Sequence, residues 1–217
     1  MQFDIVTIFP KILDSYFSES ILKRAQAKKL IEINTHDLRN FASDKHRHVD
    51  DTPYGGGPGM IFKVEPIYHC LKSIKRQKRS KVILLDPAGK QLDQKLALRL
   101  SKEKQLIFIC GRYEGVDARV HKLIDERISI GPYVMSGGEL GAAVIIETVA
   151  RLLPGVLGSA DSLQTETFTG AKVDVAEYPQ YTRPEAFKGQ KVPKILLSGD
   201  HGQIANWRQN RTKRLKK

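Results

Sequence analysis

Short apolar segments alternate with helical ones up to residue 153, and this alternation constrains the fold more than any other feature. We predict strands at the apolar runs 3–9, 81–86, 105–110 and 127–131. The middle two runs are apolar without a break, as in strands that are covered on both faces. Helical periodicity lies between the strands, over residues 10–29, 66–79, 91–102, 116–124 and 138–153. A repeated strand and helix predicts an α/β fold with a mostly parallel sheet.

The composition changes after "LLPGVLG", residues 152–158. The polar stretch "SADSLQTETFTGAKVD" follows, and its lack of periodicity is typical of a linker. We therefore expect a domain over residues 1–158, a linker over 159–176 and a small helical domain over 177–217.

Three of the predicted strands run into loops that contain glycine: "DPAGK" (86–90), "CGRYEGVD" (110–117) and "IGPYVMSGGEL" (130–140). The carboxyl ends of parallel strands meet at one edge of a sheet, so these loops predict a ligand pocket there. None has the dinucleotide fingerprint or the phosphate-loop lysine. We expect a ligand that is held by backbone groups and need not be a polyphosphate.

The segment "DDTPYGGGPGM", residues 50–60, has four glycines and two prolines in eleven positions. Glycine is favoured where φ is positive or where another molecule comes close to the backbone, and proline stiffens such a loop. A stiff, bare loop suits a flat ligand such as a nucleobase. A tight connection without a ligand is the alternative interpretation.

The formal net charge of +12 predicts a polyanionic partner, either a nucleic acid or, as the alternative, an anionic membrane surface. The tail "ANWRQNRTKRLKK" has six basic residues and no acid, and Trp207 at its start could stack or pack. A second basic run, "LKSIKRQKRSK", covers residues 71–81. Either run could follow phosphates, or be a solvated helix face or a frayed terminus.

No apolar run approaches the roughly 20 residues that span a bilayer, and no basic leader precedes the first strand, so we expect a cytoplasmic protein without a membrane partner. Two cysteines, Cys70 and Cys110, are typical of reduced, buried thiols in their apolar contexts. The cluster "DKHRHVDD" (44–51) lacks a further spaced ligand pair, so we expect no structural metal. A loosely held magnesium ion is left open.

Five segments carry a resemblance to a known family. They are "HVDDTPYGGGPGM", "LIFICGRYEGVDARV", "SIGPYVMSGGEL", "RLLPGVLG" and "YPQYTRPEAFKGQKVPKILLSGDHGQIANWR". In this order they resemble the bacterial tRNA (guanine-N1)-methyltransferases, which modify the guanosine at tRNA position 37, next to the anticodon. The resemblance implies an α/β domain with a trefoil knot, a homodimer, S-adenosylmethionine as methyl donor, tRNA as partner and a small helical C-terminal domain that grips the tRNA.

A sulfonium methyl donor needs no phosphate cradle, which fits the missing lysine. The resemblance places the donor site, mostly through main-chain contacts, at Leu85, Asp86, Pro87, Gly111, Glu114, Ile130, Gly131, Pro132, Tyr133, Val134, Met135, Gly137 and Gly138. Any single glycine among them could instead be a turn former.

The resemblance also implies the binding site for tRNA. The guanine pocket would be walled by Asp50, Tyr54, Gly55, Gly56, Gly57, Pro58 and Gly59, and the target base would be flipped out of its stack to reach it. In the basic tail, Arg208, Arg211 and Arg214 are expected to contact phosphates.

Guanine N1 holds a proton at neutral pH, so methylation needs a base for that proton and a cation for the negative charge that develops on N1 and O6. The resemblance implies Glu166 as the base and Arg151 as the cation. Asp161 and Asp174 are fallback bases. For Arg151, a surface arginine that compensates the dipole at a helix end is the alternative.

The chain departs from the family pattern in four places. Glu166 stands where the family usually has Asp, Pro132 and Gly141 stand where it tends to have Asp and Pro, and the linker after Phe168 is longer than usual. Two other functions stay open: a knotted ribose 2′-O RNA methyltransferase, which would share the donor pocket, and a non-catalytic RNA-binding protein.

Overall fold

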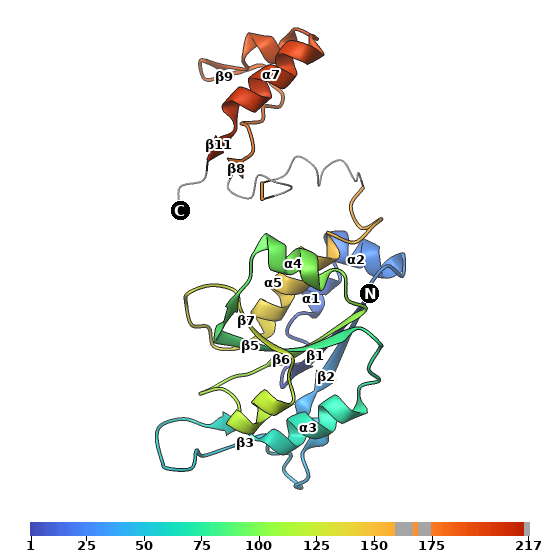
Figure 1. Ribbon diagram of the computed structural model, residues 1–217, viewed down its shortest axis with the longest axis vertical. Helices are drawn as coiled ribbons and strands as arrows, with labels where there is room; N and C mark the ends of the chain where they lie inside the picture. Colours follow the sequence, from blue (N-terminus) through green and yellow to red (C-terminus); the bar gives the residue numbers. More distant parts are fainter. Residues whose placement is uncertain (159–166, 169–174, 215–217) are drawn as a thin grey trace. The chain divides into compact units, whose positions relative to one another are not determined.

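A computed structural model describes residues 1–158, 167–168 and 175–214. The chain forms two compact units, Met1–Gly158 and Ser159–Lys217, and each is described by itself. The first unit is an α/β layer structure with helices on both faces of a parallel sheet (Figure 1).

The sheet has five strands in the order β2-β1-β6-β5-β7, and all neighbours pair in parallel. The strands are β1 (Gln2–Thr7), β2 (Glu32–Asp37), β5 (Ser80–Gln91), β6 (Gln105–Cys110) and β7 (Glu126–Ser129). Two further strands, β3 (Asp50–Asp51) and β4 (Ile61–Phe62), form a separate hairpin. The predicted parallel sheet is confirmed, and β2 at its edge was not predicted.

Five helices surround this sheet: α1 (Asp14–Phe17), α2 (Ser20–Ala27), α3 (Val64–Ser73), α4 (Gln94–Leu100) and α5 (Glu139–Ala150). Helices α1, α2, α4 and α5 pack on one face, whereas α3 packs on the other with the 3₁₀ helices η1 (Leu38–Phe41) and η2 (Ala118–Lys122) (Figure 1). The helix predicted over 10–29 is two helices, since Ser20 has a φ of 52°. The helix predicted over 116–124 is the 3₁₀ helix η2.

Strand β6 shows why its sequence is apolar without a break. Phe108 and its alternate neighbours face the core below α5, while Ile107 and Ile109 face the core around α3. Every residue of the strand is buried. The predicted coverage on both faces is therefore confirmed. Cys70 and Cys110 are buried free thiols, also as predicted.

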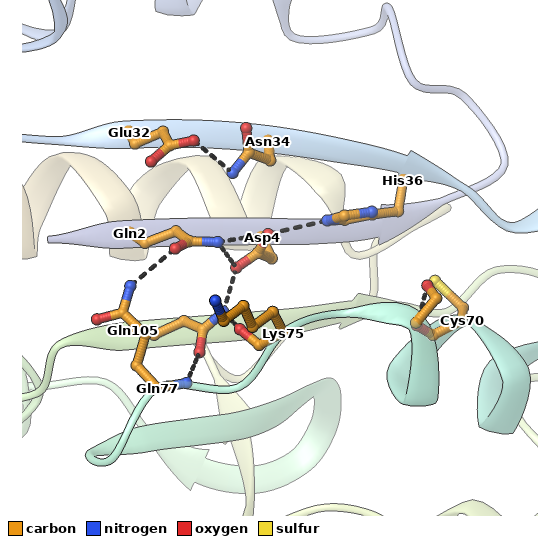
Figure 2. A network of polar contacts seen from close by, with 10 residues as sticks. Gln2, Asp4, Glu32, Asn34, His36, Cys70, Lys75, Gln77 and Gln105 are labelled. Carbon is orange, nitrogen blue, oxygen red and sulfur yellow. Dashed lines mark hydrogen bonds and ion pairs between the residues drawn. The ribbon is translucent and has the colours of Figure 1, made fainter.

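One buried acid interrupts the apolar sheet (Figure 2). Asp4 of β1 is 1% exposed and makes hydrogen bonds with His36 at 2.9 Å, with Gln105 at 2.8 Å and with Gln2. Burial raises the pKa of Asp4, but the hydrogen bonds from His36, Gln105 and Gln2 outweigh burial and leave the pKa below its usual value. The cluster joins three strands through one carboxylate.

Strand β7 pairs with β5 in two registers. Ile128 pairs with Leu85 and, after a register shift, with Lys90. The chain between them passes so close to β7 that a Cβ atom on Gly89 would lie 2.6 Å from the carbonyl carbon of Arg127. The segment after Leu85 therefore passes close along the backbone of β7, and only glycine fits at this contact.

The second unit contains the helix α7 (His201–Arg211), capped by Asp200, whose side chain accepts from the N–H of Gln203. The 3₁₀ helix η3 (Lys194–Leu197) precedes it. The described residues of this unit also form two strand pairs: β9 (Ala186–Phe187) with β10 (Gln190–Lys191), and β8 (Val175–Ala176) with β11 (Lys213–Arg214). The C-terminal helix is as predicted, and the strand pairs were not.

Candidate active site

The carboxyl ends of β5, β6 and β7 surround a cavity of about 370 Å³. This volume is in the range of small-molecule sites. The residues predicted for the donor line it, apart from Pro132: Leu85, Asp86, Pro87, Gly111, Glu114, Ile130, Gly131, Tyr133, Val134, Met135, Gly137 and Gly138. Three loops that are separate in the sequence thus form one site.

Two of these loops contact each other through their backbones. The N–H of Gly138 donates to the carbonyl of Gly111 at 3.0 Å, and Arg112 forms a β-bridge with Gly137. A Cβ atom on Gly138 would lie 2.9 Å from the Cα atom of Cys110. The loops after β6 and β7 can approach this closely because glycine stands at the contact.

A buried carboxylate lies beneath these two loops. Glu139, in the first turn of α5, is 1% exposed, and its Oε1 accepts from the hydroxyl of Thr7 at 2.7 Å and from Nε of Arg112 at 3.2 Å. Its Oε2 is 3.1 Å from Nη2 of Arg112 but accepts no hydrogen bond from any described residue. The guanidinium of Arg112 also lies 4.5 Å from the ring centroid of Phe9.

Sequence reasoning missed this network. Glu139 sits where acids commonly start an exposed helix, and Thr7 and Arg112 are distant in the chain. The one signal in the sequence is the pair of glycines before it, which we assigned to the donor.

The bare loop is the tip of the β3–β4 hairpin and borders the cavity. Its glycines all have positive φ: Gly55, Gly56, Gly57 and Gly59. Tyr54 is fully exposed. Asp50 lies in β3, the strand that leads into this loop. The N–H of Glu114 donates to the carbonyl of Met60 at 3.1 Å, so the loop with its Pro58 is anchored beside a wall of the cavity. The structure therefore brings the predicted base-binding loop and donor loops together.

The two predicted catalytic residues are not both described. Arg151 follows α5 directly, and its N–H donates to the carbonyl of Glu147. The 12 residues of α5 make it about 18 Å long, so Arg151 and the cavity lie at opposite ends of this helix. Glu166 lies outside the described residues, as do Asp161 and Asp174.

In the second unit, the arginines of α7 lie over aromatic rings. The guanidinium of Arg208 is 5.1 Å from the ring centroid of Tyr178, and that of Arg211 is 5.8 Å from the ring centroid of Trp207. Both arginines are exposed, so each presents to solvent a cation that lies over an aromatic ring. The side chain of Arg214 lies outside the described residues.

The comparison with protein families decides the family. The model for tRNA (guanine-1)-methyltransferase TrmD matches residues 1–217. The chain belongs to this family. It is 54% identical over 209 residues to the tRNA (guanine-N(1)-)-methyltransferase of Dictyoglomus turgidum, covering 96% of this chain and 84% of that protein.

The enzymes of the same name from Geobacter sp. (strain M21) and Clostridium novyi are 51% and 48% identical. Each match covers 96% of this chain, and it covers 84% of the Geobacter protein and 85% of the Clostridium protein. The resemblance seen in the motifs is thereby confirmed, and the protein is an enzyme, a tRNA methyltransferase of the TrmD family.

The basic run 71–81 is partly neutralised by acids. Arg76 and Lys81 lie 3.4 and 3.9 Å from the carboxylate of Asp125, and Arg79 lies 3.8 Å from that of Glu103. These contacts favour the interpretation of this run as a solvated surface of the methyltransferase.

The two thiols are buried, and the pKa of each is raised. Burial raises the pKa of Cys70 to about 12, and burial together with the nearby Glu139 raises that of Cys110 well above its usual value. Residues 1–158, 167–168 and 175–214 bring no three His, Cys, Asp or Glu side chains together as a metal site. His48 instead contacts Asp44 at 2.9 Å.

Among the residues that the structure describes, no helix is long and apolar enough to cross a membrane.

Proposed function

We propose that this protein transfers the methyl group of S-adenosylmethionine to N1 of the guanosine at position 37 of tRNA. The observation that carries the proposal is the glycine-walled cavity beside the bare hairpin loop, in a chain of the TrmD family. The relatives are named for action on guanine N1 of tRNA, and the same chemistry suits this site.

The cavity fits S-adenosylmethionine in size and in the groups it offers. Its volume is about 370 Å³, and its walls expose the backbone of glycine-rich loops rather than a cluster of cations. Asp86 and Glu114 add carboxylates at the rim, which suit the positive charges of the donor. When bound, the donor supplies an electrophilic methyl group, and the chain supplies the rest of the chemistry.

The residues of the chain act on the guanine. Asp50 accepts from the N–H edge of the flipped base, and the loop Tyr54–Gly59 lets the base approach the backbone. Glu166 takes the proton from N1, which frees the N1 lone pair for attack on the methyl group. Arg151 stabilises the negative charge that develops on O6.

The active form is a homodimer. Leu140 and Val144 lie one turn apart on α5 and are 62% and 43% exposed. Three other large apolar side chains, Phe9, Ile12 and Tyr16, are also exposed in the segment that follows β1. Because Thr7 contacts Glu139, that segment starts beside the first turn of α5. A second copy of the chain would cover this apolar surface.

A dimer also accounts for the place of Arg151. Since it stands at the far end of α5 from its own cavity, we assign it to the cavity of the partner subunit. Each active site then combines the donor loops of one chain with Arg151 and the linker acid of the other.

We assign the trefoil knot of this family to residues 1–158. The close passage of the segment after Leu85 along the backbone of β7 supports this assignment. Residues 177–217 are assigned to tRNA binding, 159–176 to the linker that carries the base, and the enzyme to the cytoplasm.

Methylation of a tRNA transcript in vitro, followed by nucleoside analysis, tests the function. We expect 1-methylguanosine at position 37, and replacement of this guanosine by adenosine should abolish it. A 2′-O-methylated nucleoside would favour the ribose methyltransferase, and RNA binding without methylation would favour the non-catalytic alternative. Repeating the assay with EDTA and then with added MgCl₂ tests the magnesium ion that the sequence leaves open.

A further inference from the structure

We infer that Glu139 is a positioning residue for the methyl donor: it fixes the distance between the two glycine loops that wall the cavity. This inference rests on the proposed function, because it assumes that S-adenosylmethionine occupies the cavity. Glu139 itself does not line the cavity. Its effect must therefore pass through its neighbours.

The contacts of Glu139 connect β1 with the loop after β6. Its Oε1 binds Thr7, at the carboxyl end of β1, and Arg112, in the loop after β6. Its own backbone directly follows the loop after β7, because α5 begins at Glu139 after the N-cap residue Gly138. One residue thus connects β1 and the loops after β6 and β7.

Arg112 transmits this anchoring to the donor site. It lines the cavity, and its backbone forms the bridge with Gly137 that holds the two loops together. The guanidinium is 19% exposed and is held between Glu139 and the ring of Phe9. Without the carboxylate, the arginine would lose its ion pair and could swing toward the cavity.

The space around the carboxylate is shaped for it. A Cβ atom on Gly137 would lie 2.5 Å from Oε2 of Glu139 and 2.7 Å from Nε of Arg112. Burying a charge is costly even when it is paired, and Oε2 accepts no hydrogen bond from any residue that the structure describes. A well-packed apolar residue at this position would stabilise the fold more than a buried carboxylate does. The presence of Glu139 here therefore favours a role for it in the donor site.

The test is the affinity for S-adenosylmethionine and S-adenosylhomocysteine, measured by calorimetry on Glu139→Gln. The amide keeps the shape and the acceptor for Thr7, but it removes the charge that faces Arg112. We expect at least tenfold weaker binding of both ligands. In the steady state, KM for S-adenosylmethionine should rise by the same factor, while kcat at saturating donor stays within threefold and the Kd for tRNA within twofold.

Asp4→Asn is the matched control, because Asp4 is also 1% exposed and also holds several strands, but it contacts no residue of the cavity. It should lower the melting temperature and leave the donor Kd within twofold. Loss of donor affinity in both variants in proportion to their loss of stability would overturn the inference, since that pattern reports a general loosening of the fold.

Two further variants test the route. If Glu139 acts through Arg112, the double variant Glu139→Gln/Arg112→Gln should bind the donor no more weakly than Arg112→Gln alone, whereas multiplying effects would contradict this route. Thr7→Val removes the hydrogen bond to Glu139, and that from the N–H of Phe9, without changing the charge, and it should weaken donor binding at least threefold. If Glu139→Gln does not fold, Thr7→Val serves as the test in its place. Unchanged donor affinity in Thr7→Val would then overturn the inference.

The outcomes separate the two proposals. A parent protein that binds neither ligand overturns the proposed donor and the inference with it. A parent that binds both, with a folded Glu139→Gln variant that binds them within threefold, overturns the inference alone.

Discussion

Gly59 and Glu114 are so close that a Cβ atom on Gly59 would lie 2.7 Å from Cγ of Glu114. Gly59 belongs to the hairpin loop assigned to the guanine, whereas Glu114 lines the cavity assigned to the donor. In the proposed function the two substrates meet across this contact, so we expect a change on one side to affect the other.

The first prediction is that Gly59→Ala lowers kcat/KM for tRNA at least about tenfold more than Gly55→Ala. Both glycines have positive φ, 78° and 88°, so alanine costs about 1–2 kcal/mol of backbone strain at either position. At Gly55 the added methyl group meets nothing within 4 Å, whereas at Gly59 it displaces Glu114. Steady-state methylation of tRNA measures the difference, and equal losses would show that the contact has no functional weight.

The second prediction concerns acid stability. The pKa of Asp4 is lowered in the folded protein, so its contribution to stability is present above the unfolded pKa and is lost as the pH falls through the folded one. Asp4→Asn should lower the free energy of unfolding by about 3 kcal/mol at pH 7, because the amide keeps one acceptor oxygen where the carboxylate offers two, so either His36 or Gln105 loses its acceptor.

The difference in the free energy of unfolding between the parent protein and Asp4→Asn should become smaller as the pH is lowered from 5 toward 2. Urea unfolding over this range measures it. A difference that is constant with pH would mean that the charge of Asp4 does not contribute to stability.

Strands could be predicted from the sequence where their burial produces a recognisable pattern of apolar residues. The run 105–110 is β6, with the predicted bounds, because a strand covered on both faces is apolar throughout. Strand β2 was missed for the opposite reason. Its sequence "EINTHD" is half exposed at the edge of the sheet, so it shows neither an apolar run nor a clear alternation.

The candidate site, like the sheet, could be predicted from the sequence only in part. Loops at strand ends are local in sequence, so the donor loops could be found from their glycines. The Glu139–Arg112 pair could not, because its partners are 27 residues apart and an acid at a helix start ordinarily reads as a solvated cap. The close approach at Gly89 is likewise a property of the chain path rather than of any short pattern.

A third prediction concerns the basic tail. Replacing Arg208, Arg211 and Arg214 with Gln should weaken tRNA binding and flatten the slope of log K against log salt by roughly 0.7 to 0.9 for each lost phosphate contact. Donor affinity should not change. The matched control is Arg76→Gln with Lys81→Gln, since both lie against Asp125. An unchanged slope in the tail variant would remove these arginines from the RNA interface.

A fourth prediction follows from the distance between Arg151 and its own cavity. Arg151→Ala and Gly111→Asp should each be inactive, the first for lack of the cation and the second because a carboxylate enters the donor cavity. Mixed subunits should regain up to about half of the activity per hybrid dimer, because one of the two sites is then intact. Sedimentation as a monomer at micromolar concentration, or hybrids without activity, would contradict the shared site.

The last prediction tests the base where this chain departs from its family. Glu166→Gln should keep donor binding but slow the chemical step by roughly 10²-fold or more, because an amide does not accept the N1 proton. Single-turnover methylation of tRNA at saturating S-adenosylmethionine measures this step. A Gln variant within about threefold of the parent would exclude Glu166, and the same substitution at Asp161 and Asp174 would then identify the base.

Glu166→Asp is the control that separates charge from reach. It restores the shorter acid that the family usually has, so it keeps the carboxylate and removes one methylene. If the linker adapts, the Asp variant should retain most of the activity that the Gln variant loses. If the backbone is shifted to match the longer side chain, both variants should be slow. Raising the pH should then not speed up the Asp variant, because its carboxylate is too far from N1 rather than wrongly protonated.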